Sequence, residues 1–96
     1  MPLTRPQIQK LKGLAHHLNP VVRVGGNGIT DAVIDKTDKE LEIHELLKVK
    51  IDADRDELRV AADALASGTR AEIVQIIGKV VILYRRRSEK PTIELD

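Results

Sequence analysis

Apolar residues recur at helical spacing in three stretches of the chain, and each stretch begins with a helix-capping pattern. The first starts at the capping box Thr4-Arg5-Pro6-Gln7 and is expected to run to about His17. The second starts at Thr30, and the third starts at Asp54 with Gly68 as its expected stop. The apolar positions that define the three helices are Ile8, Leu11, Leu14, Ala15 and Leu18, then Val33, Ile34 and Leu41, then Leu58, Ala61, Ala62 and Leu65.

Short apolar or alternating runs between and after these helices predict four strands. Residues 21–24 follow Asn19-Pro20, and residues 47–51 alternate strictly, which places Lys48 and Lys50 on one face. The runs 72–77 and 80–85 flank Gly78-Lys79, and glycine first in a two-residue connection is typical of a type II′ hairpin. The order α-β-α-β-α-β-β predicts an α/β fold with a four-stranded mixed sheet packed with helices.

The chain length of 96 residues suits one hydrophobic core. We therefore expect a single domain over residues 1–96, with an ordered part at about 3–86 and a tail at 87–96. The composition is 42% hydrophobic with Tyr84 as the one aromatic residue, so aliphatic side chains must fill the core. A domain of this size buries little more than about 60% of its unfolded surface. A surface site is therefore expected, and no deep pocket for a small-molecule substrate or cofactor.

Several functional classes find little support in the residues. The chain has no cysteine, which excludes disulfides, cysteine zinc sites and thiol nucleophiles. Its longest apolar stretch, residues 73–83, is interrupted by polar residues and is far shorter than the ~20 residues of a membrane helix. The three histidines show no metal-ligand spacing, and neither serine has a histidine nearby in sequence. We expect a cytoplasmic protein that is not an enzyme and has no metal or membrane partner.

The formal net charge of +1 conceals a segregation of charge along the chain. Residues 1–28 contain four basic residues and no acid, residues 29–72 contain twelve acids and seven basic residues, and residues 73–88 contain only basic charges, Lys79 and Arg85-Arg86-Arg87. If the two basic ends meet in the fold, they form a positive surface suited to a polyanion. The alternative is that the charges only solvate the surface.

Glycines cluster between the first strand and the second helix, in the run Gly25-Gly26-Asn27-Gly28. Glycine permits positive φ and lets a large ligand approach the backbone, and the following helix offers free N–H groups to a phosphate. The run is neither a Walker loop nor a dinucleotide fingerprint, and a strand-to-helix turn alone can require such glycines. Gly-x-x-Gly loops also clamp nucleic-acid backbone in KH domains, beside a basic surface. Here the preceding helix places Arg5, Lys12 and His16 on one arc.

Several separated motifs resemble one family. The run Leu11-Lys12-Gly13-Leu14-Ala15-His16, followed by Leu18, Pro20 and the glycine loop, resembles the CRM domain, the chloroplast RNA splicing and ribosome maturation module. The runs His44-Glu45-Leu46-Leu47-Lys48-Val49-Lys50, Ile77-Gly78 and Leu83-Tyr84-Arg85 resemble its later segments, so the resemblance spans about residues 3–85. In length and lack of appended domains the chain resembles the stand-alone bacterial YhbY-type proteins.

The resemblance implies both a fold and a function. The fold would be similar to the C-terminal domain of bacterial translation initiation factor three. The function would be RNA binding through the Gly-x-x-Gly loop and neighbouring basic residues, in association with precursors of the large ribosomal subunit. By position, the resemblance carries Lys12, His16, Gly25 and Gly28 onto the site. The second helix departs from this picture because it is dense in acids.

Two functional hypotheses follow. The first is an RNA-binding assembly factor of the large subunit that contacts ribosomal RNA backbone. Its candidate residues are Arg5, Lys12, His16, Arg23, Gly25, Gly26, Asn27, Gly28, Lys48, Lys50, Arg85 and Arg86. Tyr84 could stack on a base or close the core. The second hypothesis is a non-catalytic protein-interaction adaptor that uses the acidic face of the second helix. The sequence does not fix the oligomeric state; a monomer is our expectation.

Overall fold

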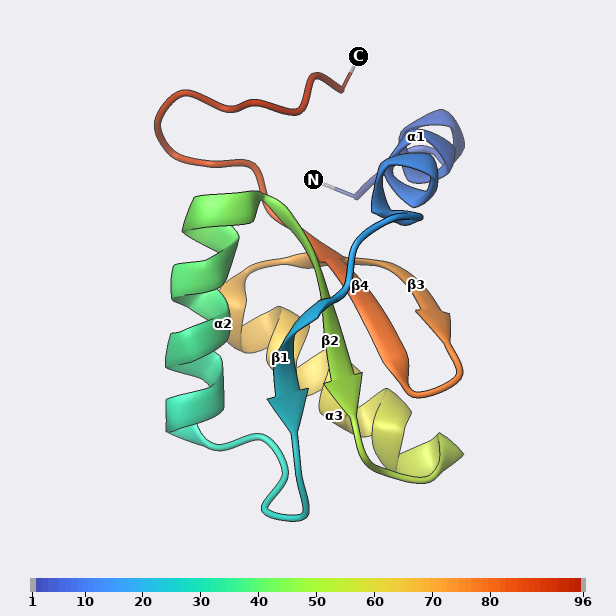
Figure 1. The fold of residues 1–96 in the computed structure, drawn as a ribbon, viewed down its shortest axis with the longest axis vertical. Helices are drawn as coiled ribbons and strands as arrows, with labels where there is room; N and C mark the ends of the chain where they lie inside the picture. The colour runs from blue at the N-terminus through green and yellow to red at the C-terminus, as the bar shows by residue number, and fades with distance from the viewer. Residues whose placement is uncertain (1, 96) are drawn as a thin grey trace.

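The computed structural model describes residues 2–95, and its elements follow the predicted order (Figure 1). The helices are α1 (Arg5–Ala15), α2 (Asp31–His44) and α3 (Arg55–Thr69), and the strands are β1 (Pro20–Val24), β2 (Leu46–Ile51), β3 (Glu72–Ile77) and β4 (Val80–Tyr84). The predicted α/β class and mixed sheet are confirmed. The first helix ends at Ala15, slightly before the predicted end at about His17.

All three predicted helix starts are confirmed by their capping hydrogen bonds. At α1, the Gln7 N–H donates to Thr4 Oγ1 at 3.3 Å, and the Thr4 N–H donates to Gln7 Oε1 at 2.9 Å, which completes the capping box. At α2, Thr30 Oγ1 accepts from the Val33 N–H at 3.2 Å, and at α3 Asp54 Oδ1 accepts from the Glu57 N–H at 3.1 Å. Each bond satisfies a backbone donor that the first helical turn leaves free.

Gly68 does not stop α3, so that prediction was wrong. The helix continues to Thr69, and Arg70 adopts the left-handed cap conformation, with φ at 59°. Gly68 instead lies where α3 meets α2, because a Cβ built on it would be 3.0 Å from Ile34 Cδ1. The glycine therefore serves close packing between two helices rather than helix termination.

The sheet has the strand order β1-β2-β4-β3, in which β1 and β2 are parallel and the other neighbours are antiparallel. Helix α2 connects the two parallel strands, and α3 connects β2 to the β3–β4 hairpin. At the hairpin tip Gly78 has φ at +56° while Lys79 does not have a positive φ. This is the sign pattern of the predicted type II′ turn.

The two faces of the sheet have separate apolar clusters. Helices α2 and α3 pack on one face, the α2/α3 face, and α1 packs on the other, the α1 face. Tyr84 is 7% exposed and belongs to the smaller cluster on the α1 face, so it closes the core. The larger cluster contains Val22, Val24, Leu41, Leu47, Val49, Ile51, Leu58, Ala62, Leu65, Ala66, Val81 and Leu83, and the smaller one contains Leu11, Ala15, Leu46, Val74, Ile82 and Tyr84.

Helix α1 covers only one end of its face. Along β2 the residues on this face become steadily more exposed, from buried Leu46 through half-buried Lys48 to exposed Lys50. Arg23 on β1 pairs in register with Lys50, alternates with buried Val22 and Val24, and is exposed on the same face. The far end of the α1 face is therefore a bare, basic stretch of sheet. Within residues 2–95, none of the helices has the length and apolar character needed to cross a membrane.

A buried carboxylate, which the sequence did not reveal, holds the C-terminal tail. Glu45 directly follows α2, has φ at 63° and is fully buried. Its carboxylate accepts from the Arg87 N–H at 3.2 Å, the Ile93 N–H at 3.0 Å, and both the N–H and the hydroxyl of Thr92 at 2.5 Å. From the end of β4 the tail crosses the upper end of the molecule in Figure 1. Ile93 and Leu95 of the tail pack on the smaller cluster.

Candidate nucleic-acid interface

The glycine run forms a tight turn that projects from the end of β1. The Gly28 N–H donates to the Gly25 carbonyl at 3.1 Å, and Gly28 has φ at +71°, a backbone conformation that favours glycine. A Cβ built on Gly25 or Gly26 would meet no atom within 4 Å. Packing therefore does not demand these two glycines, whose missing side chains leave the loop surface open to a ligand.

The N-terminus of α2, which follows the loop, is already capped by residues of the protein itself. The Thr30 hydroxyl oxygen accepts a hydrogen bond from the Val33 N–H. Asp31 places a carboxylate in the first turn, where the helix dipole favours negative charge. An incoming phosphate would meet that carboxylate. The outer surface of the loop and its basic neighbours are thus better placed to attract phosphate than the helix end.

A shallow groove of about 390 Å³ lies between the loop and the β3–β4 hairpin. It combines an open backbone with three basic side chains and a single carboxylate. Its lining residues are Arg23, Val24, Gly25, Lys50, Asp52 and Lys79. The structure therefore brings Gly25, Arg23 and Lys50, three residues predicted from the sequence, to one place.

The strand cations beside this groove are not neutralised by the protein. Arg23, Lys48 and Lys50 form no hydrogen bond or ion pair through their side chains with any residue from 2 to 95. In contrast, Lys39 on α2 pairs with Asp35 at 2.9 Å, and Arg59 on α3 pairs with Asp63 at 3.5 Å. The α1 face thus carries positive charge that is available to a polyanion.

The predicted residues on α1 lie away from the loop. Figure 1 shows α1 at the upper end of the molecule and the loop after β1 at the lower end. Lys12 is half-buried and Arg5 and His16 are exposed, and the His16 ring contacts that of His17 edge-on at 5.1 Å between centroids. These side chains form a second basic patch, separated from the loop by the bare strands.

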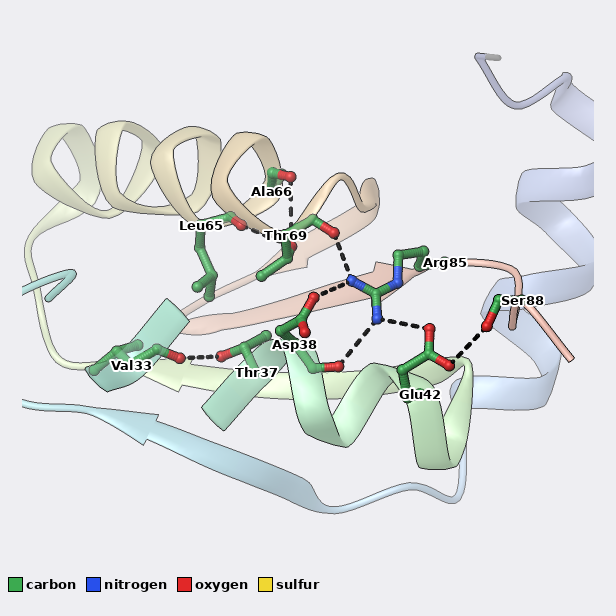
Figure 2. A network of polar contacts seen from close by, with 9 residues as sticks. All are labelled: Val33, Thr37, Asp38, Glu42, Leu65, Ala66, Thr69, Arg85 and Ser88. Atoms are coloured by element: carbon green, nitrogen blue, oxygen red, sulfur yellow. Dashed lines mark hydrogen bonds and ion pairs between the residues drawn. The ribbon is translucent and has the colours of Figure 1, made fainter. Parts of the chain in front are cut away.

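Arg85 does not reach the loop surface, because acidic residues of α2 hold it (Figure 2). Its guanidinium donates to Asp38 Oδ1 at 2.5 Å, to Glu42 Oε1 at 3.1 Å and to the Thr69 carbonyl at 2.7 Å, and the side chain is only 16% exposed. Since β4 runs antiparallel to β2, its last residue lies at the sheet end opposite the loop, so exposed Arg86 is also remote from it. Of the basic residues in the segment 73–88, Lys79 alone lines the groove beside the loop, where it meets Arg23 of the first basic segment, so the two basic segments meet there only in part.

Lys79 and Asp52 are two site residues that the sequence did not single out. Lys79 Nζ lies 3.0 Å from Asp52 Oδ1, and both residues line the groove. The backbone brings them together, because the Ile51 N–H donates to the Lys79 carbonyl at 2.8 Å. Only the register between β2 and β4 determines this contact, and no local pattern in the sequence encodes it.

Comparisons with known proteins find a matching family model and similar sequences. Residues 3–85 match the family model of the CRS1/YhbY (CRM) domain. The chain is 48% identical to a protein of Haemophilus influenzae named as an RNA-binding protein, across 97% of this chain and 94% of that one. It is 39% identical to a Bacillus subtilis protein named as a probable RNA-binding protein, across 97% and 98% of the two chains.

A solved structure shares the fold. The solution structure of a hypothetical Staphylococcus aureus protein, described as a candidate RNA-binding protein, superposes with a TM-score of 0.85 at 37% identity, covering 98% of this chain and 99% of that one. The relatives carry the names of RNA-binding proteins rather than of enzymes, in agreement with the expectation of a non-catalytic protein.

Proposed function

Because the chain belongs to the CRS1/YhbY (CRM) domain family, we propose that this RNA-binding protein contacts the backbone of ribosomal RNA in precursors of the large ribosomal subunit. The contact surface is the Gly25–Gly28 loop together with the bare end of the α1 face. The protein acts there as a monomeric, cytoplasmic assembly factor.

The observation that carries the proposal is the groove in which an open glycine backbone meets unpaired cations. Gly25 lies in one wall, and Arg23 and Lys50 supply positive charge that forms no ion pair with a carboxylate of residues 2–95. Each phosphate that such a cation neutralises releases condensed counterions, which is the main sequence-independent source of nucleic-acid affinity. Lys48, and Lys12 and His16 on α1, extend the same face away from the loop.

The mode of recognition follows from the scarcity of aromatic rings. The chain has one residue among Phe, Tyr and Trp, and that residue, Tyr84, is buried, so only histidine rings are available to stack on exposed bases. Affinity therefore comes from phosphate contacts and from the shape of a folded RNA. Binding should weaken steeply as salt is raised.

The test is the double variant Gly25→Asp with Gly26→Asp, measured against a structured fragment of large-subunit ribosomal RNA. Neither position has positive φ or a close neighbour, so the fold should be retained while two carboxylates repel phosphate at the loop. Ala64→Asp with Ser67→Asp, at exposed positions on α3, adds the same charge on the other face and serves as the control.

We expect the loop variant to lose binding and the α3 variant to bind nearly as well as the wild type. Equal affinity of a well-folded loop variant and the wild type would overturn the role of the loop. Absence of binding by the wild type at low salt would overturn the proposed function as a whole.

A further inference from the structure

We propose that Lys79 and Asp52 form a guanine-reading subsite in the groove beside the glycine loop. The inference rests on the proposed RNA binding and goes beyond it, because contacts to phosphate alone carry no sequence information. It assigns a base-recognition role to an ion pair at the tip of the β3–β4 hairpin.

The hydrogen-bonding pattern of the pair carries the proposal. Lys79 Nζ lies 3.0 Å from Asp52 Oδ1, so one ammonium donor stands directly beside two carboxylate acceptors. The Watson–Crick edge of guanine presents the complement, one carbonyl acceptor beside two N–H donors. The ammonium can donate to guanine O6 while the carboxylate accepts from N1–H and the N2 amino group. The pair thus reproduces the donor–acceptor–acceptor order of the edge of cytosine.

The same pattern rejects the other three bases. Cytosine presents a donor and then two acceptors, so its amino group would face the ammonium and its two acceptors would face the carboxylate. Adenine presents its amino donor where the ammonium requires an acceptor. Uracil matches the pair at O4 and N3–H, but its O2 would lie against the second carboxylate oxygen, where guanine offers an N–H donor. A site that leaves a polar group unmatched on binding loses much of the gain from its other hydrogen bonds.

The backbone holds the two side chains beside the loop. The Asp52 N–H donates to the Val24 carbonyl at 3.0 Å, which ties Asp52 to the last residue before Gly25. The Ile51 N–H donates to the Lys79 carbonyl at 2.8 Å, which ties the hairpin tip to the end of β2. The groove of about 390 Å³ is within the usual range of ligand sites, roughly 300–1,000 Å³. Arg23 and Lys50 in its lining are available for the flanking phosphates.

A purely structural role does not account for the pair. The side chains are 55% and 74% exposed for Lys79 and Asp52, and ion pairs this exposed contribute little to folding. Asp52 is also the one carboxylate in the lining of a groove that otherwise carries only basic charges. A carboxylate weakens attraction for phosphate, so its presence there is better explained by recognition of N–H donors on a base.

The test uses three RNA heptamers of uridine whose central nucleotide is guanosine, inosine or adenosine. Inosine differs from guanosine by the loss of the 2-amino group alone. Binding to the full chain is followed by NMR titration at low salt. Bidentate contacts to a base discriminate by roughly 10-fold or more. We expect guanosine to bind about 10-fold more tightly than adenosine, with inosine between them.

Asp52→Asn should abolish the preference, because an amide cannot accept both N–H donors, and the adenosine heptamer should bind the variant more tightly than it binds the wild type, because the groove loses its carboxylate. Asp63→Asn removes the same charge from α3, where Asp63 pairs with Arg59, and should keep the preference. Equal wild-type affinity for the three heptamers, or a preference that survives in Asp52→Asn, overturns the subsite. Failure of all heptamers to bind while structured ribosomal RNA binds also overturns the subsite but leaves the proposed function standing. Failure of both RNAs overturns both.

Discussion

On the α2/α3 face, side chains of all four strands are packed under two helices, and cations on both helices are paired with acids. On the α1 face, one helix of 11 residues covers one end of the sheet, and three strand cations have no protein partner among residues 2–95. Helix α2 carries five acids and two lysines, whereas α1 carries three basic residues and no acid. The α2/α3 face is thus arranged for stability, and the α1 face leaves charge free for a ligand.

The difference also explains why basic residues that were predicted as one site have different roles. Arg85 directly follows β4, and its guanidinium forms ion pairs with Asp38 and Glu42 of α2. Arg23 and Lys50 form no ion pair with an acid of residues 2–95 and lie at the bare end of the sheet. The environment of each cation, rather than its membership of a basic segment, therefore decides whether it can bind RNA. The acids that hold Arg85 are correspondingly less available to a protein partner.

Among substitutions that only remove positive charge, neutralising the strand cations should give the largest effect on RNA binding. In Arg23→Gln with Lys50→Gln, two phosphate contacts are lost, so the slope of log K against log salt should fall by about two. The affinity at 0.1 M salt should fall by roughly 30- to 60-fold. Lys39→Gln with Arg59→Gln makes the same charge change on the other face and should leave the slope unchanged. Equal losses in the two variants would mean that the faces do not differ in function.

Removing the charge of Glu45 should loosen the covering of the α1 face. Burial alone would raise the pKa of this carboxyl, but donors from Thr92, Arg87 and Ile93 outweigh burial and hold the pKa below its ordinary value of 4.5. Glu45→Gln leaves some of these donors without an acceptor, at a cost of about 1–3 kcal/mol in the free energy of unfolding at pH 7. Chemical denaturation measures this cost. Glu94→Gln, at an exposed tail position, is the matched control.

The pH dependence of stability distinguishes a charged Glu45 from a merely buried one. A carboxyl whose folded pKa lies below its unfolded value stabilises the fold above the unfolded pKa, and this contribution is lost as the pH falls through the folded pKa. The wild type should therefore lose stability below about pH 4.5 more steeply than Glu45→Gln. Parallel curves for the two proteins would show that the Glu45 charge does not hold the tail.

Changes at α1 should have the smallest effect on RNA binding and should locate the centre of the site. Lys12→Gln with His16→Gln alters the basic patch at the end of the face remote from the loop. We expect a loss of no more than about eightfold at 0.1 M salt, the effect of one phosphate contact. Lys36→Gln with His44→Gln on α2 is the matched control. A loss larger than that of the Arg23 and Lys50 variant would place the centre of the interface on α1.

The features predictable from the sequence are those encoded by a few neighbouring residues. The caps at Thr4, Thr30 and Asp54 depend on contacts three residues away, and the alternation around Lys48 and Lys50 is equally local. The glycine turn was located for the same reason.

The features that could not be predicted depend on contacts between distant parts of the chain. The Lys79–Asp52 pair joins residues 27 positions apart, and the bonds of Arg85 to Asp38 and of Glu45 to Thr92 join residues 47 apart. Gly68 is explained only by the side chain of Ile34 on another helix. These contacts decide which charged residues are available to a ligand. The site predicted from the sequence therefore contains more basic residues than the structure brings together at the groove.

The most direct measurement is NMR mapping of backbone amides during titration with a structured fragment of large-subunit ribosomal RNA. The account predicts that the largest shifts occur in Gly25–Gly28, Arg23 and Lys50, that they vanish at high salt, and that the outer face of α2 from Asp35 to Glu42 is unaffected. Shifts centred on α2 or α3, with the glycine loop unchanged, would contradict it.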